Sequence, residues 1–188
     1  MADGLPVTAA DRDPGPEEAA LVAVQAAIAT PPVVAVARAM SHFGEHALGW
    51  VVLSGLGALV QPKRRRDWLL VGAGAVAAHA AAIMIKLVVR RARPNHPAIA
   101  VNVATPSALS FPSAHATSTT AAAMLLCRAT RSPLPLVLVP AMALSRLVLG
   151  VHYPTDVLAG AAVGAAVAQA AARLAGRSEG DAYVSAHE

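Results

Sequence analysis

Long apolar stretches, separated by short polar segments, make up most of the chain. Four of them, residues 43–60, 67–89, 133–150 and 154–174, approach the roughly 20 apolar residues that a membrane-spanning helix needs. A fifth stretch, 112–127, is shorter and begins with polar residues, so we expect its first turns to face a polar cavity. The pattern predicts an all-α fold, a polytopic bundle of membrane helices.

The segment before the first of these stretches, residues 17–40, is apolar but interrupted by Pro31 and Pro32. Proline is favoured in the first turn of a helix, and Thr30 suits the position just before it. We therefore expect one short helix, a break, and a second helix that leads into Phe43. The first helix either spans the membrane or lies in its interface, so the bundle is expected to have five to six transmembrane helices.

Both ends of the chain are polar. The first 18 residues contain five acidic residues and one arginine, so they lack the positive region that begins a secretory signal peptide. Prolines and charges of this kind are typical of disorder. We predict a disordered tail over residues 1–16, a membrane domain over 17–176 and a second disordered tail over 177–188.

Composition and charge support a membrane protein. Charged residues make up 14% of the chain and the mean hydropathy is +0.54, whereas soluble domains carry roughly 25% charged residues. The net charge is +4, but the basic residues flank predicted helices and aromatic residues reach only 3%. Because no aromatic platform accompanies the basic residues, we expect no nucleic acid as a partner.

Basic residues also predict the topology. Three connecting segments are rich in them, and the positive-inside rule places these segments in the cytoplasm: they carry Lys63, Arg64, Arg65 and Arg66, then Arg128 and Arg131, then Arg173 and Arg177. The segment 90–111 then faces outward, although it opens with Arg90, Arg91 and Arg93. Long irregular loops are usually functional or disordered, and an outward arginine cluster calls for an anion.

Three groups of polar residues stand out on this outer side: Lys86 with Arg93, then Ser113 with His115, and finally Arg146, His152 and Asp156. Pro112 suits the start of a helix, whose free amides favour an anion. Asp156 would lie in the first turn of the last helix, where a carboxylate is stabilised and can hold the imidazole of His152. The lysine and the arginines supply fixed positive charge for phosphate oxygens.

These groups resemble the signature of the type 2 phosphatidic acid phosphatase superfamily, which reads Lys-x6-Arg-Pro, Pro-Ser-Gly-His and Ser-Arg-x5-His-x3-Asp. Every position matches except Ala114, which replaces a glycine and loses access to positive φ. The resemblance implies that His152 is the nucleophile, that Asp156 orients it and that His115 is the general acid. It also implies a phosphate site and requires no metal or other cofactor. The phosphate-binding residues would be Lys86, Arg93, Ser113, Ala114 through its amide, and Arg146.

The resemblance implies a lipid-linked phosphate as the substrate, hydrolysed among membrane lipids at the outer face of the plasma membrane. The string from Arg38 to His46 is similar to actinobacterial decaprenylphosphoryl-5-phosphoribose phosphatases, which act in the synthesis of the arabinose donor for the cell wall. Prenyl diphosphates, phosphatidylglycerophosphate and phosphatidic acid are the alternatives. Glu45 and His46 begin an inward helix on the same side and are candidates for the substrate pocket. For His79, which lies on roughly the same helix face as Lys86, we expect helix packing, with pocket lining as the alternative.

Other interpretations remain open at this point. A lipid-phosphate transporter or flippase would use the same basic cluster, but it needs no nucleophile. His152 and Asp156 with His115 are also a possible set of metal ligands. A haloperoxidase with bound vanadate would be largely soluble, which this chain is not. We expect Arg90 and Arg91, which lie between the motif positions, to contact lipid headgroups only.

Overall fold

The computed structural model describes residues 13–185, with side chains described for residues 13–177. Its helices are α1 (Pro16–Ile28), α2 (Pro31–Gly44), η2 (Glu45–Ala47), α3 (Leu48–Val60), η3 (Pro62–Arg64), α4 (Arg65–Val89), α5 (Ala114–Thr130), η4 (Leu134–Val137), α6 (Leu138–Val148) and α7 (Pro154–Ser185). The described part contains no strand, only an isolated bridge between Ala92 and Leu109. The predicted all-α class is therefore confirmed.

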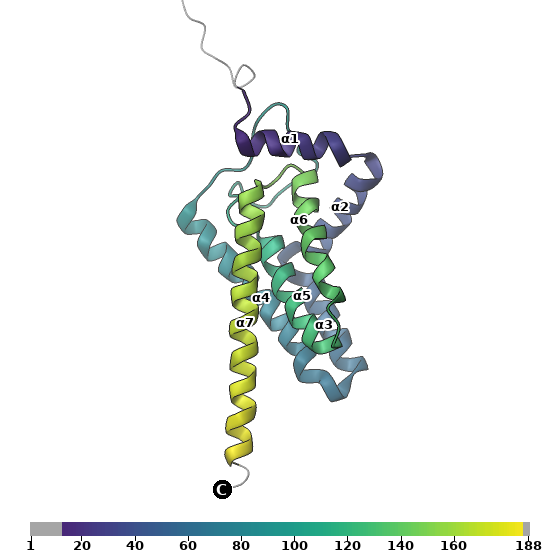
Figure 1. Ribbon diagram of the computed structural model, residues 1–188, viewed down its shortest axis with the longest axis vertical. Coiled ribbons are helices and arrows are strands. Elements are labelled where there is room, and N and C mark those ends of the chain that lie inside the picture. Colours follow the sequence, from purple (N-terminus) through teal and green to yellow (C-terminus); the bar gives the residue numbers. More distant parts are fainter. Residues whose placement is uncertain (1–12, 186–188) are drawn as a thin grey trace, which may run out of the picture.

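Three stretches are long and apolar enough to cross a membrane: Pro31–Val60, Pro62–Val89 and Pro154–Arg177. Leu134–Val148 is a shorter apolar helix, and α5 has 17 residues. Counting α2 with α3 as one pass, and α4, α5, α6 and α7 as one each, the described residues form five segments along the bundle (Figure 1). This agrees with the expected membrane bundle.

The predicted break before Pro31 is present, and it separates α1 from the bundle. α1 ends at Ile28 and α2 begins at Pro31, and Figure 1 shows α1 lying across one end of the bundle. Leu21 of α1 is fully buried. One turn later on the same face, the side chain of Gln25 donates to the carbonyls of Ala100 (2.7 Å) and Val148 (3.1 Å). α1 is thus fastened to the long loop and to the end of α6.

A second break, between α2 and α3, also shapes the site. His46 (φ 50°) and Ala47 (φ 60°) both adopt the left-handed region, which costs free energy for residues other than glycine. The helix axis changes direction there. Gly44 and Glu45, which precede this break, lie at the end of α2, near the loops that carry the polar motifs.

α5 is the central helix, and most of it is buried between α4 and α7. Close approach depends on small residues, as is common between membrane helices: a Cβ at Gly164 of α7 would lie 2.3 Å from the carbonyl oxygen of Thr117. The expectation that the first turns of α5 face a polar cavity is only partly correct. Ala114 and His115 line a cavity, whereas the buried hydroxyls of Thr117 and Ser118 donate to backbone carbonyls of the preceding turn.

The predicted domain limits at residues 16 and 176 stay a prediction. Residues 1–12 and 186–188 lie outside the described residues. Between these, α7 continues past residue 177 to Ser185, so the predicted C-terminal tail begins within this helix.

Candidate active site

The three polar motifs converge on one cavity of about 600 Å³. The predicted residues that line it are Lys86, Arg93, Ala114, His115, Arg146 and His152, together with Glu45 and His46. The other two predicted residues, Ser113 and Asp156, are fully buried and lie behind this lining. Segments that are far apart in the sequence thus supply polar side chains to one cavity.

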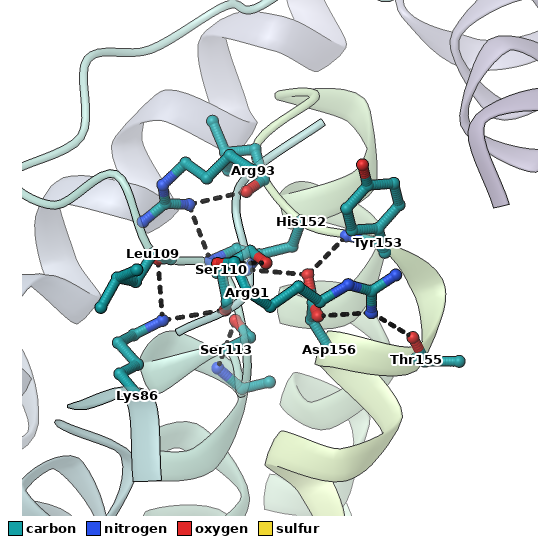
Figure 2. A network of polar contacts seen from close by, with 12 residues as sticks. Lys86, Arg91, Arg93, Leu109, Ser110, Ser113, His152, Tyr153, Thr155 and Asp156 are labelled. Atoms are coloured by element: carbon teal, nitrogen blue, oxygen red, sulfur yellow. Dashed lines mark hydrogen bonds and ion pairs between the residues drawn. The ribbon is translucent and has the colours of Figure 1, made fainter. Parts of the chain in front are cut away.

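His152 lies between a cation and a carboxylate. Its Nε2 is 3.3 Å from Nη1 of Arg93, and its Nδ1 is 3.6 Å from Oδ2 of Asp156 (Figure 2). The second distance exceeds the hydrogen-bond range, so we treat this contact as electrostatic. The side chain is only 4% exposed. The ring therefore presents Nε2 to the cationic wall of the cavity and Nδ1 to Asp156.

Burial sets the protonation state of this histidine. Burial, together with the charges of Arg93 and Lys86, lowers the pKa of His152 to about 4, although Asp156 opposes the shift. Burial also lowers the pKa of Arg93, but an arginine stays charged at neutral pH. At pH 7 the imidazole is neutral and one ring nitrogen has a free lone pair.

Asp156 is held in one orientation. Its Oδ1 accepts a hydrogen bond from Nη1 of Arg91 (2.9 Å), and its Oδ2 accepts one from the amide of Tyr153 (2.8 Å). Its backbone carbonyl accepts from the amide of Ser113 (2.9 Å). These contacts join the first turn of α7 to the start of α5 and fix the carboxylate beside His152.

Arg91 belongs to this site, contrary to the expectation that it contacts lipid headgroups only. Besides Asp156, it donates to Oγ1 of Thr155 (2.7 Å), forms an ion pair with Glu17, and lies 4.0 Å from the centre of the Tyr153 ring. Sequence analysis missed both Arg91 and Glu17. No spacing rule identifies them, because their contacts form only when α1 and α7 meet the loop.

The cations of the first motif are oriented mainly by backbone carbonyls of the long loop, residues 90–111. Nζ of Lys86 donates to the carbonyls of Leu109 (3.1 Å) and Ser110 (2.8 Å). Arg93 donates through Nε to the carbonyl of Ser107 (2.8 Å) and through Nη1 to that of Val151 (2.6 Å). The loop therefore works as a frame that holds two positive charges beside His152.

Another part of the cavity is built around Ser41 of α2. Nε2 of His115 lies 3.0 Å from the Ser41 carbonyl, and Nη1 of Arg146 donates to the Ser41 hydroxyl (3.0 Å). Nη2 of Arg146 reaches the carbonyl of Ala37 at 3.4 Å. No sequence pattern singles out Ser41, yet this residue contacts two of the predicted site residues at once.

The start of α5 accommodates the residue that departs from the family pattern. Ala114 is the first residue of the helix, and Oγ of Ser113 caps it by accepting from the amide of Ala116 (3.4 Å). Among the described residues, left-handed φ occurs at His46, Ala47, Arg90, Arg131 and Gly150. Ala114 is not one of them, so this position does not need the freedom of glycine.

Two histidines line a further part of the same cavity. The rings of His46 and His79 lie 5.8 Å apart, and both residues line the cavity with Glu45. Nδ1 of His79 is buried and makes no hydrogen bond to the described residues. His79 therefore faces the cavity instead of serving helix packing alone. The described side chains offer no group of three or more His, Cys, Asp or Glu residues placed to hold a metal ion.

Comparisons with known proteins agree with this geometry. The family model of the PAP2 superfamily matches residues 67–179. The decaprenylphosphoryl-5-phosphoribose phosphatase of Mycobacterium tuberculosis (strain H37Rv) is 64% identical over 155 residues, which cover 82% of this chain and 88% of the relative. The protein of the same name from Mycolicibacterium smegmatis is 70% identical over 148 residues, 78% of this chain and 82% of the relative. These matches confirm the resemblance that the motifs indicated.

A solved structure is similar in fold. A transmembrane PAP2 type phosphatidylglycerolphosphate phosphatase from Bacillus subtilis superimposes with a TM-score of 0.68. The match covers 90% of each chain, at 23% sequence identity. At this identity the likeness concerns the helical architecture, and the choice of substrate has to be argued from the cavity.

Proposed function

We propose that this chain, which belongs to the PAP2 superfamily, is a membrane phosphatase that hydrolyses the phosphate monoester of decaprenylphosphoryl-5-phosphoribose. The mycobacterial relatives that carry this name are 64% and 70% identical to it. The chemistry is phosphoryl transfer through a phosphohistidine on His152.

One observation carries the proposal: a single cavity joins the catalytic groups to an apolar face. Ile83 and Leu87 of α4 line the cavity and are 41% and 60% exposed. They lie four residues apart and so share one face of the helix, next to Lys86. A substrate whose tail stays in the bilayer can therefore reach His152 from the side, with its phosphate among the cations.

The first chemical step forms a bond from His152 to phosphorus. Nε2 attacks while the bond from phosphorus to the sugar oxygen breaks. Arg93 lies 3.3 Å from Nε2. It stabilises the negative charge of the transferring phosphoryl group together with Lys86 and Arg146. Such electrostatic stabilisation is a main source of catalysis in phosphoryl transfer. Asp156 stabilises the positive charge that develops on the ring as Nδ1 keeps its proton.

His115 provides the proton that the leaving oxygen needs. A sugar oxide is a poor leaving group, so proton donation in the transition state accelerates its departure. In the second step His115 takes a proton from water, the water oxygen attacks phosphorus, and the bond to His152 breaks. Inorganic phosphate leaves and both histidines return to their starting states.

The Glu45, His46 and His79 part of the cavity is the subsite for the sugar hydroxyls. These side chains supply donors and acceptors beyond what a phosphate needs, and the buried Nδ1 of His79 has no partner among the described residues. A site that is built to hydrogen-bond a hydroxyl discriminates strongly against substrates that lack it. Phosphatidic acid has no hydroxyl groups there.

The active site faces outward from the plasma membrane. Arg64 donates to the carbonyl of Ala129, and Arg128 pairs with Asp67, so two of the basic segments meet at one end of the bundle, away from the site. The positive-inside rule puts that end in the cytoplasm. In a Cys127→Ser background, Ala98→Cys should react with an impermeant maleimide added to intact cells, and Arg65→Cys should not. The reverse pattern would invert this topology.

A phosphate-release panel tests the substrate. The purified protein is given decaprenylphosphoryl-5-phosphoribose, phosphatidylglycerophosphate, phosphatidic acid and a prenyl diphosphate, with His152→Ala as the control. We expect the phosphoribose lipid to give the highest kcat/KM. A higher kcat/KM for another lipid would replace this substrate, and release that His152→Ala retains would overturn the mechanism. Lipid transport without phosphate release would favour a flippase.

A further inference from the structure

We propose that Glu17 of α1 is a positioning residue for the catalytic pair of His152 and Asp156, and that it acts through Arg91 and Thr155. The inference rests on the proposed phosphatase function. It assigns a role in turnover to a helix that lies outside the three sequence motifs and before residue 67, where the family match begins.

The two carboxylate oxygens of Glu17 bind two different parts of the site. Oε1 accepts hydrogen bonds from the amide (3.1 Å) and the hydroxyl (2.6 Å) of Thr155, in the first turn of α7. Oε2 forms an ion pair with Nη2 of Arg91. The same arginine reaches Asp156 with Nη1 at 2.9 Å. Arg91 alone thus links Glu17 to Asp156, the carboxylate beside His152.

Arg91 is immobilised by this arrangement. Its guanidinium bridges two carboxylates and lies over the Tyr153 ring at 4.0 Å. Arg91 is 30% exposed, so without Glu17 its end nearest the solvent would be free to turn. Arg91 holds Oδ1 of Asp156 while the amide of Tyr153 holds Oδ2, so the position of Arg91 contributes to how the carboxylate is directed at His152.

Glu17 also balances charge. The ion pair with Glu17 draws part of the guanidinium charge away from Asp156, which leaves Asp156 better able to stabilise a positive ring on His152. Burial opposes ionisation of Glu17, but hydrogen bonds from Thr155 and Arg91 outweigh it, and the pKa of Glu17 is lowered. The carboxylate is therefore charged at neutral pH. It also lies at the N-terminus of α7, where a negative charge is stabilised.

α1 is well suited to carry such a residue. Glu17, Leu21 and Gln25 follow at intervals of four and share one face of the helix. Leu21 is fully buried, and Gln25 makes hydrogen bonds to Ala100 and Val148. The helix is docked at two further points, so Glu17 approaches the site from a fixed support.

Glu17→Gln tests the inference in the purified full-length chain. Glutamine keeps an acceptor for Thr155 but removes the charge that holds Arg91. With decaprenylphosphoryl-5-phosphoribose we expect kcat to fall about tenfold, the effect of losing one charge-assisted hydrogen bond. KM should stay within about twofold, because the phosphate contacts are untouched. Arg91→Gln should lower kcat to a similar extent. The kcat of the double variant should equal that of the less active single variant, because both residues act through one chain of contacts.

Two control variants separate positioning from simple stability. Gln25→Ala removes one of the two further docking points of α1, while buried Leu21 and the contacts of Glu17 with Thr155 and Arg91 keep the helix in place. This variant should lower the thermal unfolding midpoint but leave kcat near the wild-type value. Arg90→Gln removes the neighbouring exposed arginine and should leave both unchanged. If Gln25→Ala lowers kcat as much as Glu17→Gln does, the effect comes from docking of α1, and the inference is wrong.

The remaining outcomes also decide between the two proposals. Wild-type kcat in Glu17→Gln, or a rise in KM with kcat unchanged, overturns the role of Glu17 and leaves the phosphatase function intact. Should Glu17→Gln fail to fold, Arg91→Gln gives the same test, since normal kcat there excludes the chain of contacts. If the wild-type protein releases no phosphate from any lipid of the panel, the proposed function itself fails.

Discussion

A methyl group added at Gly44, at the end of α2, should impair His115 as the general acid and leave His152 as the nucleophile unaffected. A Cβ added at this residue would lie 2.7 Å from Cδ2 of His115 and 3.4 Å from the terminal carbon of Met142. The backbone there (φ −81°, ψ −6°) is accessible to alanine. Gly44→Ala therefore perturbs the His115 ring and leaves the backbone unstrained.

The size of the effect follows from this contact. Carbon atoms in contact lie about 3.5–4.0 Å apart, so the His115 ring has to move by about 1 Å. A misplacement of about 1 Å can cost about 10²-fold in rate. Because kcat/KM reports the first step, in which the leaving oxygen departs, the loss in kcat/KM should reflect only the missing proton donation to that oxygen. We expect a loss approaching 100-fold on the lipid substrate, but only a few-fold loss on nitrophenyl phosphate, whose leaving group needs no proton.

The assay compares kcat/KM of Gly44→Ala and the wild type on both substrates, with Gly55→Ala as the matched control. A Cβ at Gly55, in α3, meets nothing within 4 Å, so this variant should behave like the wild type. Equal losses of Gly44→Ala on the two substrates would refute the assignment of His115 as the general acid. Undiminished activity on the lipid would show that the ring is not held where the structure places it.

Three further predictions concern the chemistry at His152. Since its pKa is lowered to about 4, the neutral ring should persist as pH falls from 7 to 5, and kcat/KM, corrected for substrate ionisation, should drop only near pH 4; a drop near 6.5, the ordinary value, would contradict the burial argument. Asp156→Asn should lower kcat by less than His152→Ala does, because the imidazole remains, and it should affect lipid and aryl phosphates alike; a loss confined to one of them would contradict this. Vanadate, which mimics the five-coordinate phosphoryl group, should inhibit competitively, while a chelator should have no effect; activity that a chelator abolishes and a divalent ion restores would favour a metal site.

Much of the helical architecture was predictable, because a small number of physical rules determines where membrane helices form. The apolar stretches, the break at Pro31 and the all-α class follow from hydropathy and from proline chemistry. The convergence of Lys86, His115 and His152 followed from their placement at the ends of alternating helices. These residues were also recognisable as a spaced motif.

The rest depends on tertiary contacts that leave no periodic signal. Arg91 differs from its neighbour Arg90 only in where the loop directs it, and Glu17 looks like any acidic residue at the start of a helix. Ser41 contributes its carbonyl as well as its hydroxyl, and the carbonyl is common to every residue. The hydroxyls of Thr117 and Ser118 looked like cavity lining, but they donate to their own helix backbone, because α4 and α7 close around α5.

Trapping the phosphoenzyme tests the central claim most directly. The His115→Ala variant is mixed with labelled nitrophenyl phosphate and quenched at alkaline pH, and the labelled residue is identified by mass spectrometry. Because attack by His152 proceeds with this leaving group while the step that needs a base is slowed, the label should accumulate on His152 and be absent when His152 is also replaced by alanine. Label on any other residue would contradict a mechanism that passes through His152. So would phosphate release without labelled protein, whether by the His115→Ala variant or by the variant that also lacks His152.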